Sequence, residues 1–306
     1  MLKKVIFGIL MFPTILLAQY ERPGSTDAQF LKIGVSPRGA GMSDAFIAVV
    51  EGAEATYYNP AALAWLDGTD FVFNHTKWFA GINHDFVAAA QSFGRIGTFG
   101  ASLTALYTDE MTVRTPLQPD GTGETFYAGN FRLGLSYSRF LTNRVTIGGT
   151  LSYIRMSLYS GFTADAVAAD IAVLYSTDFR GFRFGMKIAN FGSEVKFVNE
   201  SYPLPTNFTF GMCMNAIQME QNTLLVSFSA TKPNDGQPLG QAGVEYNFNH
   251  LLFLRMGYNL NHEVARYSFG SGVHLTIRGL KTSFDYAYSD MNLLGAAHRF
   301  GLRLSF

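Results

Sequence analysis

The clearest pattern in the chain is a two-residue alternation of apolar and polar positions, which is strictest in its last ten residues. A period of two is typical of an extended strand whose two faces meet different surroundings. Segments of this kind, rich in Val, Ile, Thr, Tyr and Phe and bounded by turn residues, recur from residue 69 onward. The pattern predicts fourteen strands, over residues 69–79, 83–93, 97–108, 125–140, 144–158, 164–177, 181–192, 204–217, 222–231, 239–248, 251–260, 266–277, 280–290 and 297–306.

The connections between these strands alternate in length. The even-numbered connections, such as 94–96 and 278–279, are short, whereas the odd-numbered ones include the long segments 109–124 and 194–203. Barrels that cross an outer membrane have short periplasmic turns and longer extracellular loops. An even strand number with both termini periplasmic gives this alternation, and only the short first connection, 80–82, departs from it.

Periodicity alone also fits a soluble β-sandwich, but composition favours a membrane. Aromatic residues make up 15% of the chain and charged residues only 15%, whereas about 25% charged residues is usual for a soluble domain. We therefore predict an all-β fold, a transmembrane antiparallel β-barrel of about 14 strands in contact with outer-membrane lipid. The last strand resembles the C-terminal signal that barrel-assembly machinery recognises, with its apolar face formed by Phe300, Leu302, Leu304 and Phe306.

The first residues set the compartment. Residues 1–18 have a charged start, Lys3 and Lys4, an apolar run over 5–17, and a plausible cleavage point after Ala18, which is the layout of a secretory signal peptide. An uncleaved anchor is the alternative, although the run is shorter than the roughly 20 residues a membrane span needs. The mature chain would carry 21 Lys+Arg against 23 Asp+Glu, a net charge of −2, which gives no argument for a nucleic-acid partner.

Residues 19–68 do not have the strand pattern and are rich in Gly and Ala. We expect a short helix over 43–50 and a second helical element with Asn59 as N-cap and Pro60 in its first position. The predicted organisation is a signal peptide over 1–18, an N-terminal plug over 19–68 and a barrel over 69–306.

Motifs in this N-terminal segment resemble the signature of the PorV/PorQ family, which is related to the FadL-type outer-membrane transporters. They are Arg38-Gly39-Ala40-Gly41-Met42 followed by Ala45-Phe46, and the run Tyr58-Asn59-Pro60-Ala61-Ala62-Leu63-Ala64, with Asp44 between them. The runs 204–211, 284–288 and 298–300 look like barrel strands of the same family. The resemblance covers most of the mature chain and implies fourteen strands with the N-terminal segment folded back as a plug in the lumen.

The resemblance leaves three functions open. PorV-like members serve the type IX secretion system, so the partners would be secretion-system subunits or exported cargo that is anchored on the cell surface. FadL-like members pass a hydrophobic small-molecule ligand, such as a fatty acid, sideways into the membrane. A structural barrel with no transport role is the third hypothesis. The N-terminal signature favours the first, whereas the modest length of the loops counts against it.

Signals for enzymatic chemistry are weak. The six His residues lack zinc-ligand spacing, no G-x-S-x-G is present, and Gly39 and Gly41 lack the third Gly of a dinucleotide fingerprint. We predict no enzyme, no cofactor and no metal. Six charged residues are expected to face the lumen: Arg183, Lys187, Arg255, Asp285, Arg299 and Arg303. We expect them to pair with one another and with the plug through Asp44, Glu51 or Glu54. The alternative is that they bind the head group of an amphipathic ligand.

Overall fold

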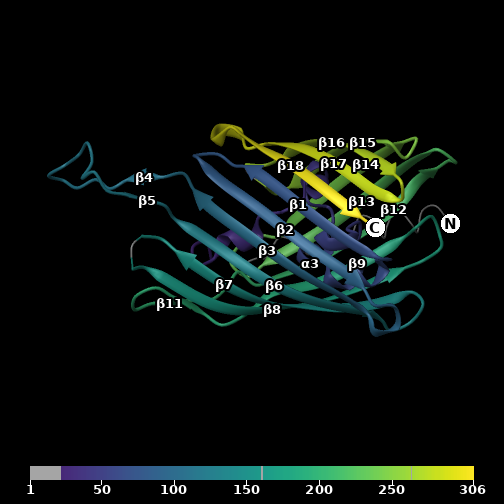
Figure 1. The fold of residues 1–306 in the computed structure, drawn as a ribbon, viewed down its shortest axis with the longest axis horizontal. Coiled ribbons are helices and arrows are strands. Elements are labelled where there is room, and N and C mark those ends of the chain that lie inside the picture. The colour runs from purple at the N-terminus through teal and green to yellow at the C-terminus, as the bar shows by residue number, and fades with distance from the viewer. Residues whose placement is uncertain (1–21, 160, 263) are drawn as a thin grey trace, which may run out of the picture.

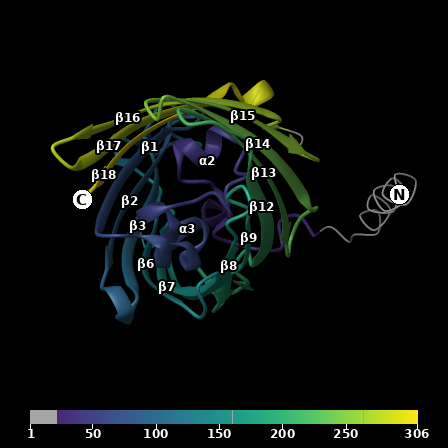
Figure 2. The ribbon, with the colours of Figure 1, turned by 90° about the vertical axis from the view of Figure 1, so that its right-hand side faces the viewer.

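The computed structural model describes residues 22–306 except 160 and 263, and within them fourteen strands close into one antiparallel barrel (Figures 1 and 2). Each barrel strand pairs with the next barrel strand along the chain. The first, β1 (Thr69–Lys77), pairs with the last, β18 (Ala296–Ser305), to complete the ring. Closure leaves no unpaired sheet edge facing lipid. The predicted all-β barrel of fourteen strands is confirmed, whereas the predicted signal peptide lies outside the described residues.

The strand boundaries differ from the predicted ones by a few residues at most ends. The largest difference is at residues 125–126, which leave the wall and form β5 (Thr125–Phe126), paired with β4 (Met111–Thr112) as a separate hairpin. A second small ladder joins β10 (Val195–Lys196) to β11 (Ser201–Tyr202). The wall strands are β1 (Thr69–Lys77), β2 (Ile82–Ser92), β3 (Thr98–Thr108), β6 (Gly129–Phe140), β7 (Val145–Ser157), β8 (Thr163–Ser176), β9 (Arg183–Gly192), β12 (Asn207–Gln218), β13 (Asn222–Pro233), β14 (Leu239–Phe248), β15 (Leu252–Leu260), β16 (Tyr267–Ile277), β17 (Leu280–Asp290) and β18 (Ala296–Ser305).

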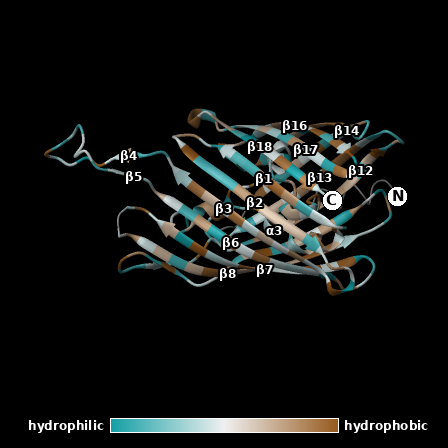
Figure 3. Cartoon of the chain, in the orientation of Figure 1, coloured by the Kyte–Doolittle hydropathy of each residue, from teal (hydrophilic) through white to brown (hydrophobic). Residues whose placement is uncertain are grey.

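Hydrophobic and hydrophilic residues alternate along the strands (Figure 3), and many of the large apolar side chains of the wall are exposed on its outer face. In β18 the side chain of Arg299 is inside and only 4% exposed, whereas its neighbour Phe300 points outward and is 52% exposed. A soluble sandwich would show the opposite arrangement. The outward apolar wall and polar lumen are the arrangement of an outer-membrane barrel.

The two ends of the barrel differ. β1 begins and β18 finishes at one end, here called the turn end, where the connections are short, as at 141–144 and 278–279. The opposite end, here called the loop end, holds the long connections 109–128 and 193–206, and the β4–β5 hairpin projects from it (Figure 1). Because Asp27 bonds to Pro203 in the 193–206 connection, the first described residues lie at the loop end. The periplasmic position of both termini stays a prediction.

The short helical elements that precede β1 in the described chain lie inside the ring of strands (Figure 2). The predicted helix over 43–50 is wrong, because Ser43 and Asp44 adopt left-handed backbone angles, with φ of 52° and 58°, and the chain turns instead. Asn59 is an N-cap, as predicted: its side chain accepts from the Ala61 N–H at 3.2 Å. The elements of the plug are η2 (Gln29–Lys32), α2 (Pro37–Gly41), η3 (Gly52–Glu54), α3 (Ala55–Tyr58) and η4 (Pro60–Trp65). None of the helices in the described part of the chain has the length and apolar character to cross a membrane.

Small wall residues let the plug backbone approach the strands closely. A Cβ on Gly257 of β15 would lie 2.2 Å from the Ser43 nitrogen, and one on Gly148 of β7 would lie 2.5 Å from Pro60. Gly270 faces Gly41 in the same way, with a Cβ-to-Cα separation of 3.1 Å. Glycine is therefore required on this part of the lumen face by contact with the plug.

Candidate functional site

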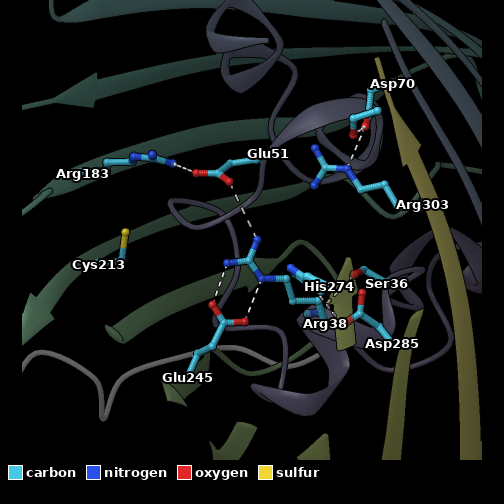
Figure 4. A network of polar contacts seen from close by, with 12 residues as sticks. Ser36, Arg38, Glu51, Asp70, Arg183, Cys213, Glu245, His274, Asp285 and Arg303 are labelled. Atoms are coloured by element: carbon cyan, nitrogen blue, oxygen red, sulfur yellow. Dashed lines mark hydrogen bonds and ion pairs between the residues drawn. The ribbon is translucent and has the colours of Figure 1, made fainter. Parts of the chain in front are cut away.

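Arg38 of the plug is bound to the wall by two hydrogen bonds. Its Nε and Nη2 donate to the two carboxylate oxygens of Glu245 on β14, at 2.8 and 2.7 Å (Figure 4). Ser36 caps α2 by accepting from the Gly39 N–H at 3.1 Å, which fixes the helical turn that carries Arg38. A bidentate pair of this kind sets both position and orientation.

The wall continues this contact into a buried charge network. Arg255 of β15 donates from Nε to Glu245 at 2.6 Å and from Nη1 to Asp285 of β17 at 2.6 Å. His274 Nε2 lies 3.6 Å from the same Asp285 carboxylate. The Arg255 side chain has no exposed surface, so its charge depends on these two acids.

Four further contacts tie the plug and the start of the wall into place. Arg183 of β9 binds Glu51 at 2.8 Å, and Glu51 also lies 4.0 Å from Arg38 (Figure 4). Arg303 of β18 binds Asp70 of β1 at 2.8 Å across the closing seam, and the Asp70 carboxylate also accepts from the Ala53 N–H. The plug is thus attached through charges on several strands.

Two predicted members of the charge set lie elsewhere. Lys187 donates to the Tyr57 carbonyl at 2.6 Å, and Arg299 donates to Ser289 at 2.8 Å while its guanidinium stacks over Trp78. Asp44 accepts from the Tyr58 hydroxyl at 2.8 Å. Of the predicted plug motif, only Arg38 enters the charge network. Gly39 and Gly41 allow neighbouring atoms to approach the backbone closely. Asn59 caps η4, and Pro60 is its first residue.

Three features of the lumen were not predicted from the sequence: Glu245, Asp70 and the buried pair of Arg132 and Asp170, whose charged atoms lie 2.9 Å apart. A signal for the first was present. Glu245 and Arg255 occupy inward positions of neighbouring strands and stand directly opposite each other in the register. When an acidic and a basic side chain both face the lumen and stand opposite each other in a hairpin, the register of the hairpin predicts an ion pair.

Burial and nearby cations shift the pKa values of the plug carboxylates in opposite directions, and the stronger effect differs between Asp44 and Glu51. Enclosure within the lumen raises the pKa of Glu51, although its side chain is still 46% exposed. Arg183 and Arg38 outweigh this effect, so the pKa is lowered from its ordinary value. For Asp44, burial dominates over Arg299 and the Tyr58 hydrogen bond, so its pKa is raised. The neighbouring arginines therefore favour the ionised form of Glu51, which binds Arg183 at 2.8 Å.

The plug separates two cavities, which share no lining residue. The loop-end cavity has a volume of about 540 Å³ and a mixed lining. Apolar and aromatic side chains share it with polar and charged ones, among them Arg132, Asp170, Lys187 and Arg299. The turn-end cavity has a volume of about 600 Å³ and is lined mainly by polar and charged side chains, including Arg183 and Arg303. Among the described residues, no group of three His, Cys, Asp or Glu is placed to hold a metal ion.

A strap formed by residues 26–33 covers part of the loop-end cavity, to which Leu31, Lys32 and Ile33 contribute. Asp235, in the connection after β13, binds the strap: its carboxylate accepts from the Thr26 hydroxyl, from Gln29 at 2.9 Å and from Lys32 at 2.9 Å. Burial opposes ionisation of Asp235, but these hydrogen bonds outweigh it and hold its pKa at about 2.

Replacing Asp235 by Asn should loosen the strap, and hydrogen exchange of amides 26–33 should become faster. The folded pKa of about 2 lies below the ordinary value of about 3.9. The stabilisation is therefore complete above about pH 4 and is lost only as the pH falls through about 2. Asp178→Asn, at an exposed turn-end acid, is the control, and equal exchange in both variants would contradict the role of Asp235.

Comparison with known proteins identifies the family. A family model described as "Type IX secretion system protein PorV" matches residues 17–236, well over half of the chain. The chain belongs to the PorV family. The predicted resemblance is thereby confirmed, and the match includes the plug and the wall through β13. Among curated proteins, no sequence matches the PorV-family chain described here.

Solved structures of two toluene transporters and of a FadL homologue share its fold. The toluene transporter TbuX of Ralstonia pickettii is 14% identical, with a TM-score of 0.60 over 89% of this chain and 97% of that one. The toluene transporter TodX of Pseudomonas putida is 12% identical, with a TM-score of 0.61 over 89% and 96%. A FadL homologue of Pseudomonas aeruginosa is 9% identical, with a TM-score of 0.55 over 89% and 98%. At these identities the likeness shows the fold alone.

Proposed function

We propose that this barrel is an accessory of protein secretion or surface attachment in the outer membrane, where it holds secretion-system subunits or an exported protein. The match to the PorV model over residues 17–236 carries this proposal. The attached plug supports it, because a lumen closed by Arg38, Glu245, Arg255 and Asp285 suits a protein that holds a partner better than one that conducts.

The arrangement in the membrane is part of the proposal. A signal peptide over 1–18 is removed, residues 19–68 form the plug and 69–306 the barrel, and the turn end faces the periplasm. The barrel-assembly machinery recognises the outward residues of β18 and the chain end, which are Phe300, Leu302, Leu304 and Phe306. No catalytic step, metal or cofactor is assigned to the chain.

Affinity purification from native membranes tests the function. A tagged chain, extracted in mild detergent, should retain secretion-system subunits or exported cargo, and deletion of the gene should deplete proteins from the cell surface. A second outer-membrane barrel, tagged and extracted in the same way, is the control. Recovery of no such partner together with an unchanged surface proteome would overturn the proposal.

A second candidate, passage of a hydrophobic small molecule, is favoured by one observation. The loop-end cavity of about 540 Å³ has Tyr57, Tyr58 and Trp78 in its lining, and the fold is that of transporters for such compounds. Against it, strand pairing continues around the whole wall, with register shifts only near Asp170 and Ala216. A hydrophobic molecule that co-purifies with the protein and is displaced by toluene would support this candidate.

A further inference from the structure

An apolar notch lies on the outer face of the wall, towards the turn end. The register places Ala89 of β2 directly beside Ala101 of β3, between the larger side chains of Phe71 on β1 and Leu135 on β6. These four strands run side by side (Figure 1). The two small side chains and Phe71 line a hollow of about 460 Å³ whose lining is almost wholly apolar and includes Leu103 and Leu133.

An aromatic row follows the notch in the direction of the turn end. Phe99 of β3 stands opposite Tyr137 of β6, with ring centroids 4.9 Å apart, and Phe93 packs against Phe99 at 5.7 Å. The Tyr137 hydroxyl donates to the Ile96 carbonyl at 2.7 Å, which orders the adjacent turn. Aromatic rows of this kind lie at the boundary between acyl chains and head groups.

Two arginines continue the same line beyond the aromatic row. Arg139 follows Tyr137 on the outer face of β6, and Arg95 lies in the turn between β2 and β3. Both are exposed, and neither guanidinium forms an ion pair or hydrogen bond with another described residue. The connections 93–97 and 141–144 contain no Asp or Glu. Asp178, from the connection between β8 and β9, binds Arg144 at 3.0 Å and not Arg95 or Arg139.

We propose that this face binds one anionic glycerophospholipid. An acyl chain fills the notch over Ala89 and Ala101, the ester region lies on Phe99 and Tyr137, and the phosphate group is bound by Arg95 and Arg139. The order of apolar hollow, aromatic row and unpaired cations is the order of the parts of such a lipid. Because the face looks outward from a closed barrel, the occupant comes from the bilayer. This site is independent of the secretion role proposed above.

Native mass spectrometry of the purified full-length protein tests the site, with palmitoyl-oleoyl phosphatidylglycerol and the zwitterionic phosphatidylcholine of the same chains as probes. The wild-type protein should retain more phosphatidylglycerol than phosphatidylcholine. Because each arginine near a head group contributes a modest electrostatic gain, Arg95→Gln with Arg139→Gln should weaken phosphatidylglycerol binding about tenfold. Ala101→Leu should fill the notch and weaken both lipids.

Matched variants separate the site from general lipid contact. Arg278→Gln removes an arginine from the turn-end connection between β16 and β17. Ala169→Leu enlarges an alanine whose side chain lies on the outer face of β8. Both should bind phosphatidylglycerol as the wild type does. Equal retention of the two lipids by the wild type, or equal losses in the control variants, would overturn the proposal. Unchanged lipid binding by the arginine variant with loss of a co-purifying protein would instead identify a protein interface.

Discussion

Glu245→Ala is expected to destabilise the folded barrel by about 3–5 kcal/mol, because it leaves two arginines without their shared acid inside the lumen. Glu245 is 4% exposed and accepts from both Arg38 and Arg255. Removing one partner of a buried pair costs more than the pair itself contributes, since the remaining charge stays desolvated. Urea unfolding in lipid vesicles, followed by tryptophan fluorescence, measures the change.

Asp178→Asn is the control for this variant. It also removes an acid that binds an arginine, Arg144 at 3.0 Å, but the Asp178 side chain is 94% exposed. Exposed pairs contribute little to stability, so its unfolding curve should match that of the wild type. An equally small effect in both variants would show that Arg38 and Arg255 find water or other partners without Glu245.

Gly257→Leu is expected to displace the plug. A Cβ at this position would lie 2.2 Å from the Ser43 nitrogen and 2.3 Å from the Met42 carbonyl carbon, both backbone atoms that cannot rotate away. Overpacking of a tight contact costs about 1–3 kcal/mol. Because each wall strand is hydrogen-bonded to both of its neighbours, we expect the plug to move and the wall to keep its position. We expect residues 37–50 to become sensitive to added protease while the barrel stays folded.

Gly129→Leu is the matched control for this substitution. Gly129 begins β6, and a Cβ there would meet only Tyr107, at 3.9 Å. Its proteolysis pattern should be that of the wild type. If Gly257→Leu also kept the wild-type pattern, the close approach of plug and wall would be less important than the geometry indicates.

The wall strands could be predicted because the pattern that specifies each strand lies within its own sequence. Alternation within single strands assigns each side chain to the lipid or to the lumen, and connection lengths separate the two ends. The observed β1 and β18 agree with the predicted segments to within about two residues, as is typical of strongly patterned strands. The inward positions of Arg255 and Arg303 also followed from alternation.

The partners inside the lumen were not predictable in the same way. Alternation gives the face of a residue but not its height in the barrel, so Lys187 and Arg299 were grouped with Arg255 although they lie in the loop-end half. The pair Arg303–Asp70 joins residues 233 positions apart, and Arg38–Glu245 joins residues 207 apart. Such pairs depend on the closure of the ring and on the path of the plug, which turns at Ser43 against its apparent helical pattern.

Single-channel recording in planar lipid bilayers is the most direct test of the claim that the plug closes the lumen. The wild-type protein should insert without a steady ion conductance, and Gly257→Leu should open a measurable one because the plug no longer fits between the strands. A large, steady conductance of the wild-type barrel would contradict the account.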